Sequence, residues 1–141
     1  MSRMTRIIVF IIVLFCVPLW ACKKDIVAVP VDITFIVHKW EVLSITAPGA
    51  SQPQKSPKPY IFEFYNVKQL SISLDVNGCS ALFDIPKTGK IAIVWHGCEK
   101  VCCDSDYANA MAQLVPKLTG YEVKGDTLTL IGAGQISLKQ L

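Results

Sequence analysis

Residues 96–118 constrain the fold more than any other part of this 141-residue chain. They hold three cysteines within six positions, followed by the one convincing amphipathic helical pattern of the sequence. Asp104 and Ser105 can cap the first helical turn, and Pro116 should end or kink the helix. The apolar positions that share one helical face are Tyr107, Ala108, Met111, Leu114, Val115 and Leu118. The pattern therefore predicts a helix over about residues 104–118.

Most of the remaining sequence has the period of short β-strands. Residues 70–76 alternate most regularly, which predicts a strand with its apolar side chains buried and its polar side chains exposed. Asn77-Gly78-Cys79 should turn the chain after it, because Asn and Gly tolerate positive φ. Residues 47–59 hold four prolines and no periodicity, which predicts a loop. The positions expected to face the core are Trp40, Val42, Ile45, Phe62, Phe64, Leu70, Ile72, Leu74 and Val76.

The sequence contains eight or nine such short strands, joined by short turns, and one helix. Consecutive strands with one buried face form antiparallel sheets that close or fold around a core. The predicted fold class is α+β but mostly β: an antiparallel, strongly curved sheet or barrel of about eight short strands, with the helix packed over an open end. Residues 31–141 should form this domain.

The N-terminus has the features of a bacterial lipoprotein leader. Arg3 and Arg6 precede an apolar run over residues 7–17, which has the length of the hydrophobic region of a signal peptide and is too short to cross a bilayer. Leu19-Trp20-Ala21-Cys22 then resembles a lipobox, in which the cysteine is acylated and becomes the first residue of the mature chain. A signal peptide cut near Ala21 without lipidation and an uncut membrane anchor are the alternatives.

The lipobox interpretation predicts a signal peptide over residues 1–21, lipidation of Cys22 and a tether that reaches residue 30. Several acyl chains would hold the protein stably at a membrane surface. Lys23 follows the cysteine where inner-membrane lipoproteins often have aspartate, so the expected location is the outer membrane of a bacterial cell envelope. Removing Arg3 and Arg6 leaves 12 basic and 11 acidic residues, a balance that does not indicate a nucleic-acid partner.

The mature chain keeps four of the six cysteines beyond the lipidation site: Cys79, Cys98, Cys102 and Cys103. An even number of cysteines in an oxidising compartment predicts two disulfides, with three possible connectivities. A bridge between Cys102 and Cys103 is the least expected, because neighbouring Cα atoms lie about 3.8 Å apart. Two connectivities remain: Cys79 with Cys103 and Cys98 with Cys102, or Cys79 with Cys102 and Cys98 with Cys103. The alternative is a soft-metal or redox site at His96, Cys98, Cys102 and Cys103, which suit Zn(II) or Cu(I).

The order of several short motifs resembles the META domain family, to which the HslJ-like proteins belong. Trp40-Glu41-Val42-Leu43-Ser44-Ile45 is similar to the opening strand of that family, and Asn77-Gly78-Cys79-Ser80 to its G-C-N turn, with serine in place of the asparagine. Cys102-Cys103-Asp104, the helix and the segment over residues 120–130 follow in the order of the family. The resemblance covers residues 37–141, and this chain departs from it by two extra cysteines and by lacking the threonine usual before the second family cysteine.

The META resemblance implies a compact β-rich domain packed on a helix and supplies no catalytic mechanism. It also implies that Cys79 pairs with Cys103, the two cysteine positions of the family, which leaves Cys98 to pair with Cys102. The family is associated with envelope stress and drug tolerance.

No enzyme signature is present in the sequence: G-x-S-x-G, a phosphate-binding glycine loop and H-E-x-x-H are all absent. We therefore expect no enzymatic activity and no cofactor. The favoured hypothesis is a membrane-anchored envelope lipoprotein with a META-like domain that has a structural or binding role connected with envelope stress tolerance. The alternative hypothesis is a cysteine-based metal-binding or redox protein of the periplasm.

Overall fold

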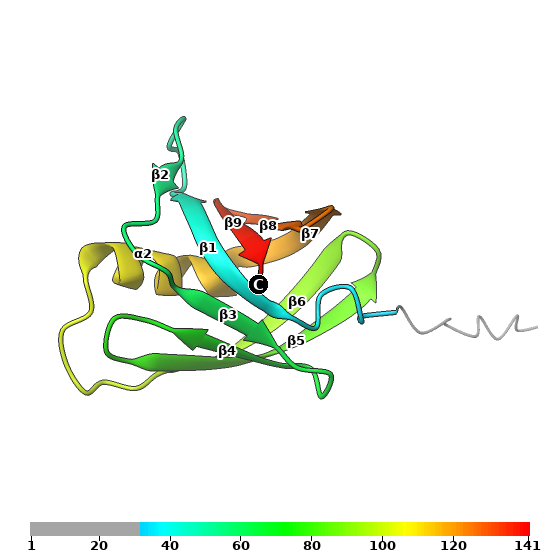
Figure 1. Ribbon diagram of the computed structural model, residues 1–141, viewed down its shortest axis with the longest axis horizontal. Coiled ribbons are helices and arrows are strands. Elements are labelled where there is room, and N and C mark those ends of the chain that lie inside the picture. Colours follow the sequence, from blue (N-terminus) through cyan, green and yellow to red (C-terminus); the bar gives the residue numbers. More distant parts are fainter. Residues whose placement is uncertain (1–31) are drawn as a thin grey trace, which may run out of the picture.

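The computed structural model describes residues 32–141, and the predicted signal peptide, Cys22 and the tether lie outside them. This part of the chain folds into nine strands, one α-helix and one 3₁₀ turn (Figure 1). The elements are β1 (Lys39–Thr46), β2 (Gln54–Lys55), β3 (Ile61–Phe64), β4 (Gln69–Ser73), β5 (Gly78–Lys87), β6 (Lys90–Cys98), α2 (Asp106–Leu114), η1 (Val115–Lys117), β7 (Leu118–Lys124), β8 (Thr127–Gly132) and β9 (Gln135–Gln140).

The strands form one antiparallel sheet in the order β2-β1-β3-β4-β5-β6-β7-β8-β9. A further pairing of β1 with β9 closes eight of these strands into a barrel, and β2 lies outside it against the end of β1. The predicted fold class, α+β and mostly β with a curved antiparallel sheet or barrel, is confirmed. The short strand β2 interrupts the segment predicted to be a loop.

The inner face of β1 shows how a β-bulge changes the pattern of buried residues. Trp40 and Val42 point into the barrel, as strict alternation requires, but the next buried residue is Ile45 rather than Ser44. The register with β9 shifts between Val42 and Ser44, so one extra residue on β1 moves the inward positions by one. The core positions predicted for this strand are confirmed.

The end of β4 corrects the predicted alternation. Leu70 and Ile72 are fully buried and Leu74 is partly buried, but Val76 is 52% exposed. The strand ends at Ser73, and the chain turns over residues 74–77 before β5 begins at Gly78. Val76 lies in that turn, so the two-residue period of a strand no longer applies to it. Cys79, predicted within the turn, is the second residue of β5.

The helix α2 lies where the amphipathic pattern predicts it, although it is shorter than residues 104–118. The Ser105 side chain caps it by accepting a hydrogen bond from the amide of Ala108 at 3.2 Å, and Asp104 does not act as the cap. The α-helix ends at Leu114, and a 3₁₀ turn containing Pro116 follows. All six residues of the predicted apolar stripe are buried.

The helix and the N-terminal turn cover opposite ends of the barrel. At one end, α2 packs against the start of β3, where Tyr107 stacks on Tyr60 with ring centroids 5.5 Å apart. At the other end, Phe35 stacks on Tyr121, and Ile36 fills the core. No helix among residues 32–141 is both long enough and apolar enough to span a bilayer.

Candidate binding groove

The barrel has a seam between β6 and β7. These two strands are paired only at Lys90 and Gly120, near the start of β6. Beyond that point the segment opposite β6 is η1 and α2 rather than a strand, and a groove of about 700 Å³ lies between them. The residues that line this groove are Leu74, Asn77, Trp95, Gly97, Cys98, Glu99, Lys100, Cys102, Cys103, Asp104, Asn109, Ala112, Gln113, Pro116 and Lys117.

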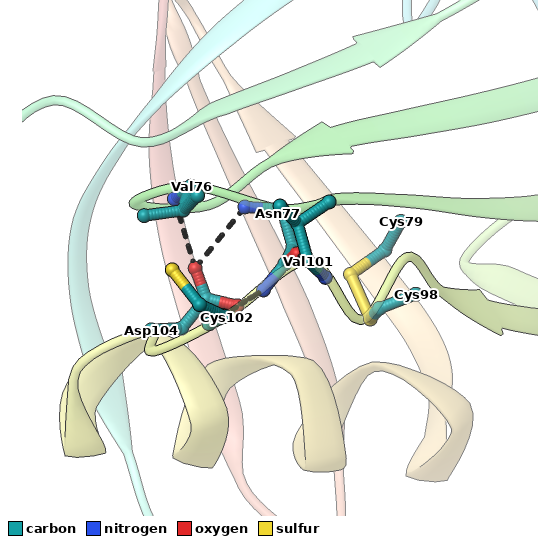
Figure 2. Close-up of a disulfide and its surroundings, with 7 residues drawn as sticks. All are labelled: Val76, Asn77, Cys79, Cys98, Val101, Cys102 and Asp104. Atoms are coloured by element: carbon teal, nitrogen blue, oxygen red, sulfur yellow. Dashed lines mark hydrogen bonds between the residues drawn. A yellow bond between two sulfur atoms is a disulfide. The ribbon is translucent and has the colours of Figure 1, made fainter.

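A disulfide joins the two strands at the end of the groove (Figure 2). Cys79 of β5 and Cys98 of β6 are direct partners in the antiparallel register, with their Cα atoms 3.9 Å apart. The predicted pairings of Cys79 with Cys103 and of Cys98 with Cys102 are therefore wrong, and so are the alternative pairings of Cys79 with Cys102 and of Cys98 with Cys103. The sequence reasoning placed Cys79 in a turn, whereas its position in β5 places it opposite Cys98.

The other two cysteines form an adjacent pair at the rim of the groove. Cys102 and Cys103 are exposed and not bridged, and their Sγ atoms lie 2.7 Å apart. The neighbouring Cys103 thiol raises the pKa of Cys102. Of the four predicted disulfide cysteines, the structure joins two as a bridge and leaves two as a vicinal dithiol.

Asn77 attaches the cysteine segment to the barrel. Apart from tyrosine and tryptophan, it is the one buried polar side chain in residues 32–141, with 6% of its surface exposed. Its Nδ2 donates to the carbonyl of Cys102 and to Oδ2 of Asp104, both at 2.5 Å, and its Oδ1 accepts from the amide of Val101 at 2.7 Å. Figure 2 shows this side chain lying between the β4–β5 turn and the segment above α2. One amide group thus satisfies the backbone of a loop that has no regular secondary structure.

Asp104 completes the connection from the other side. Its Oδ1 accepts hydrogen bonds from the amides of Val76 at 3.0 Å and Asn77 at 3.3 Å. The hydrogen bond from the Asn77 side chain, together with that from the Val76 amide, holds the pKa of the Asp104 carboxyl below its usual range. Because this carboxylate is occupied by donors of the β4–β5 turn, it positions the groove wall.

A second polar cluster fixes the start of α2. Asp75 accepts from the amide of Ser105 at 2.8 Å and from its hydroxyl at 2.6 Å, and Tyr60 donates to Asp75 at 3.0 Å. Lys58 forms an ion pair with the same carboxylate. The Lys58 ammonium and the Ser105 hydroxyl hold the pKa of Asp75 far below its usual range. The sequence predicted an exposed position for Asp75 and a helix-capping role for Asp104, whereas the two carboxylates join the turn at residues 74–77 to the segment that leads into α2.

The structure does not bring together the residues of the alternative metal site. Cys98 is in the disulfide, and His96 is an exposed residue of β6. In the described part of the chain, no three or more His, Cys, Asp and Glu side chains are arranged to hold a metal ion. The residue that sequence reasoning missed is Asn77, because an Asn-Gly pair indicates a turn whatever the asparagine side chain contacts.

Comparison with known proteins extends the description of the fold. No protein-family model matches the chain, and no curated protein matches it. A crystal structure of a DUF4847 family protein from Bacteroides vulgatus ATCC 8482 is similar with a TM-score of 0.57 and 11% sequence identity, covering 75% of this chain and 94% of that one. At this level of identity the likeness concerns the fold alone.

Proposed function

We propose that this protein is an envelope lipoprotein, anchored through Cys22, whose META-like barrel binds a partner in the groove between β6 and α2. The observation that carries the proposal is the groove itself, which combines an apolar floor with a polar rim. Leu74, Trp95 and Ala112 supply apolar surface, and Asn109 and Gln113 supply exposed amides. A concave site with a few polar groups around an apolar surface is the usual form of a binding site.

The walls of the groove are rigid, which favours binding over a merely structural role. The disulfide fixes the end of β6, and Asn77 and Asp104 fix the segment that follows it. A site held in its binding geometry loses little conformational entropy when a ligand arrives.

The position of the groove suits a protein tethered at its N-terminus. The first described residues lie beside β7, where Phe35 stacks on Tyr121, close to the β5–β6 hairpin. The disulfide end of the groove is at the far end of β6, about 25 Å further along the strand at about 3.3 Å per residue. A lipid on Cys22 would therefore hold the domain with this end of the groove directed away from the membrane.

The anchor is tested by labelling cells with a radioactive fatty acid. The wild-type chain should incorporate the label, whereas Cys22→Ser should not and should leave the membrane fraction or remain as an uncleaved precursor. An unlabelled wild-type chain would contradict the anchor.

The groove is tested separately with a photo-crosslinking amino acid in living cells. Placed at Gln113, an exposed groove residue, it should give a defined adduct; placed at Glu122, an exposed residue of β7, it should not. The same adducts from both positions would contradict a binding role for the groove.

A second candidate function is favoured by one observation, the exposed vicinal dithiol of Cys102 and Cys103. Adjacent thiols suit soft metal ions or thiol exchange. Titration of the denatured, unreduced protein should find two thiols. A stoichiometric metal in the isolated protein, together with destabilisation by a chelator, would favour this candidate over a binding module.

A further inference from the structure

We propose that the groove binds an extended polypeptide as an additional β-strand on the free edge of β6. This rests on the binding function proposed above and names the class of its ligand. Strand addition uses backbone hydrogen bonds for affinity and alternate side chains for specificity. The groove has an unpaired strand edge on one side and a fixed helix on the other.

The register of the sheet shows which backbone groups of β6 point away from β5, toward the seam that opens into the groove at Trp95. The amide of Phe83 donates to the carbonyl of Lys68 at 2.8 Å, so Phe83 turns its backbone groups toward β4 and away from β6. Its partner on β6 is Ile93, and hydrogen-bonded and non-hydrogen-bonded pairs alternate along an antiparallel ladder. Ile93 and Trp95 therefore form non-hydrogen-bonded pairs with β5. Their N–H and C=O groups point to the opposite edge.

Beyond Lys90, this edge faces η1 and α2 across the seam rather than a paired strand. Within residues 32–141, β7 is paired with β6 only at Lys90, and no loop backbone bonds to Ile93 or Trp95. Exposed sheet edges are normally protected by lysine, proline or a covering element. Residues 91–95 have no charge and no proline. The free edge thus has the chemistry that a second extended backbone recognises.

Exposed apolar side chains lie next to the free edge. Val94 is 60% exposed and Leu82, its partner across β5 and β6, is 43% exposed. A strand placed beside β6 would cover Val94 on the outer face, while its alternate side chains would reach the groove floor at Trp95 and Ala112. Covering this surface adds a hydrophobic contribution to the backbone hydrogen bonds.

The helix α2 restricts the groove to an occupant that is a single extended segment. Ala112, Gln113 and Pro116 bound the groove on the side away from β6. Its volume of about 700 Å³ lies in the range typical of ligand sites. A second copy of this chain could pair its own β6 here only if its α2 entered the same seam. An edge-to-edge dimer would therefore place two helices in the space beside β6. A flexible peptide has no such flanking element.

The charged residues that line the groove balance one another. Lys100 and Lys117 line the groove and have no ion pair within the described residues. Asp104 keeps its negative charge, because its hydrogen-bond donors are the neutral Asn77 side chain and two amides. Together with Glu99 it balances the two lysines in formal charge. The expected ligand is therefore an extended peptide with alternating apolar residues, recognised through its backbone rather than through its charge.

Random octapeptides displayed on phage are the probe, selected on the full-length chain purified in detergent. Enriched peptides, made synthetically and labelled with fluorescein, should bind the wild type in anisotropy titrations. Ile93→Pro removes the outward N–H without touching the bonds to β5, and should weaken binding by about tenfold or more. Ile93→Ala is the matched control, because it shortens the same side chain and keeps the N–H.

Equal binding by the proline and alanine variants would overturn strand addition. If Ile93→Pro does not fold, the test is made on the peptide instead. Two peptides are compared, one N-methylated at its odd-numbered amides and one at its even-numbered amides. Methylation should abolish binding in the peptide whose methylated amides face β6 and leave binding unchanged in the other. The proposal would be overturned if both methylated peptides bind equally, or if the phage selection enriches no peptide. It would also be overturned if the wild type forms a dimer that Ile93→Pro dissociates. Because the assay needs no membrane, a missing lipid on Cys22 and a missing peptide site give different results.

Discussion

The closed wall and the seam of the barrel are stabilised by different interactions. Along the closed wall, β7, β8, β9 and β1 pair over most of their length and bury large apolar side chains. At the seam, β6 and β7 share one residue pair, and polar side chains and a disulfide hold the neighbouring segment. The comparison shows how a small barrel can keep a stable core and still leave backbone groups open at one edge.

The largest expected effect is on the closed wall. Trp40 is fully buried, and its indole N–H donates to the carbonyl of Ile36 at 3.0 Å. Trp40→Ala should lower the free energy of unfolding by about 3–5 kcal/mol, measured from urea midpoints. Leu43→Ala, at an exposed position of the same strand, should change it by less than about 0.5 kcal/mol. Equal losses from the two variants would contradict the assignment of the inner face.

Next in size is the disulfide of the seam. Reduction, or replacement of Cys79 and Cys98 by alanine, should cost about 3 kcal/mol, because the bridge closes a loop of 19 residues in the unfolded chain. Cys102→Ser with Cys103→Ser is the control and should change stability little, since both thiols are exposed. An equal response of the two double variants would show that the bridge uses other cysteines.

Asn77 tests the polar side of the comparison. Asn77→Ala leaves the amide of Val101 and the carbonyl of Cys102 without their partner, and should cost about 1–3 kcal/mol. Amide hydrogen exchange should increase over residues 99–104 and not in β8. Exchange that rises equally in both regions would show that the seam and the closed wall unfold as one unit. Asn109→Ala, which removes an exposed hydrogen bond to the carbonyl of Asp104, should have a smaller effect.

The smallest expected effect is on the pH dependence of stability, through Asp75 at the start of α2. Lys58 and Ser105 lower the pKa of Asp75 in the folded chain. The contribution of its carboxylate to the free energy of unfolding is therefore fully present above a pH of about 4 and is lost as the pH falls further. Wild-type stability should therefore decrease more steeply than that of Asp75→Asn between about pH 4 and pH 2. Parallel curves from urea midpoints in this range would show that Asp75 contributes nothing through its charge.

Local patterns in the sequence predicted the buried faces of β1, β3 and β4 and the apolar face of the helix. The alternating residues of β3 and β4 place Phe62, Leu70 and Ile72 in the core, and the helical stripe is buried throughout. These patterns depend on which side chains leave water, and they repeat with the period of the element that carries them. The bulge in β1 did not spoil the prediction, because Ile45 is apolar where Ser44 is not.

The sequence by itself determined the mostly β fold class, the buried faces of β1 and β3 and the apolar face of the helix, because each follows from the order of neighbouring residues. Only the tertiary structure decided which cysteines are joined, what Asn77 contacts and where the barrel stays open. Cys79 meets Cys98 because two strands pair in one register, and the seam exists because α2 lies where another strand would continue. These contacts form between segments that are distant in the chain, and the local spacing of residues does not encode which distant segments come together.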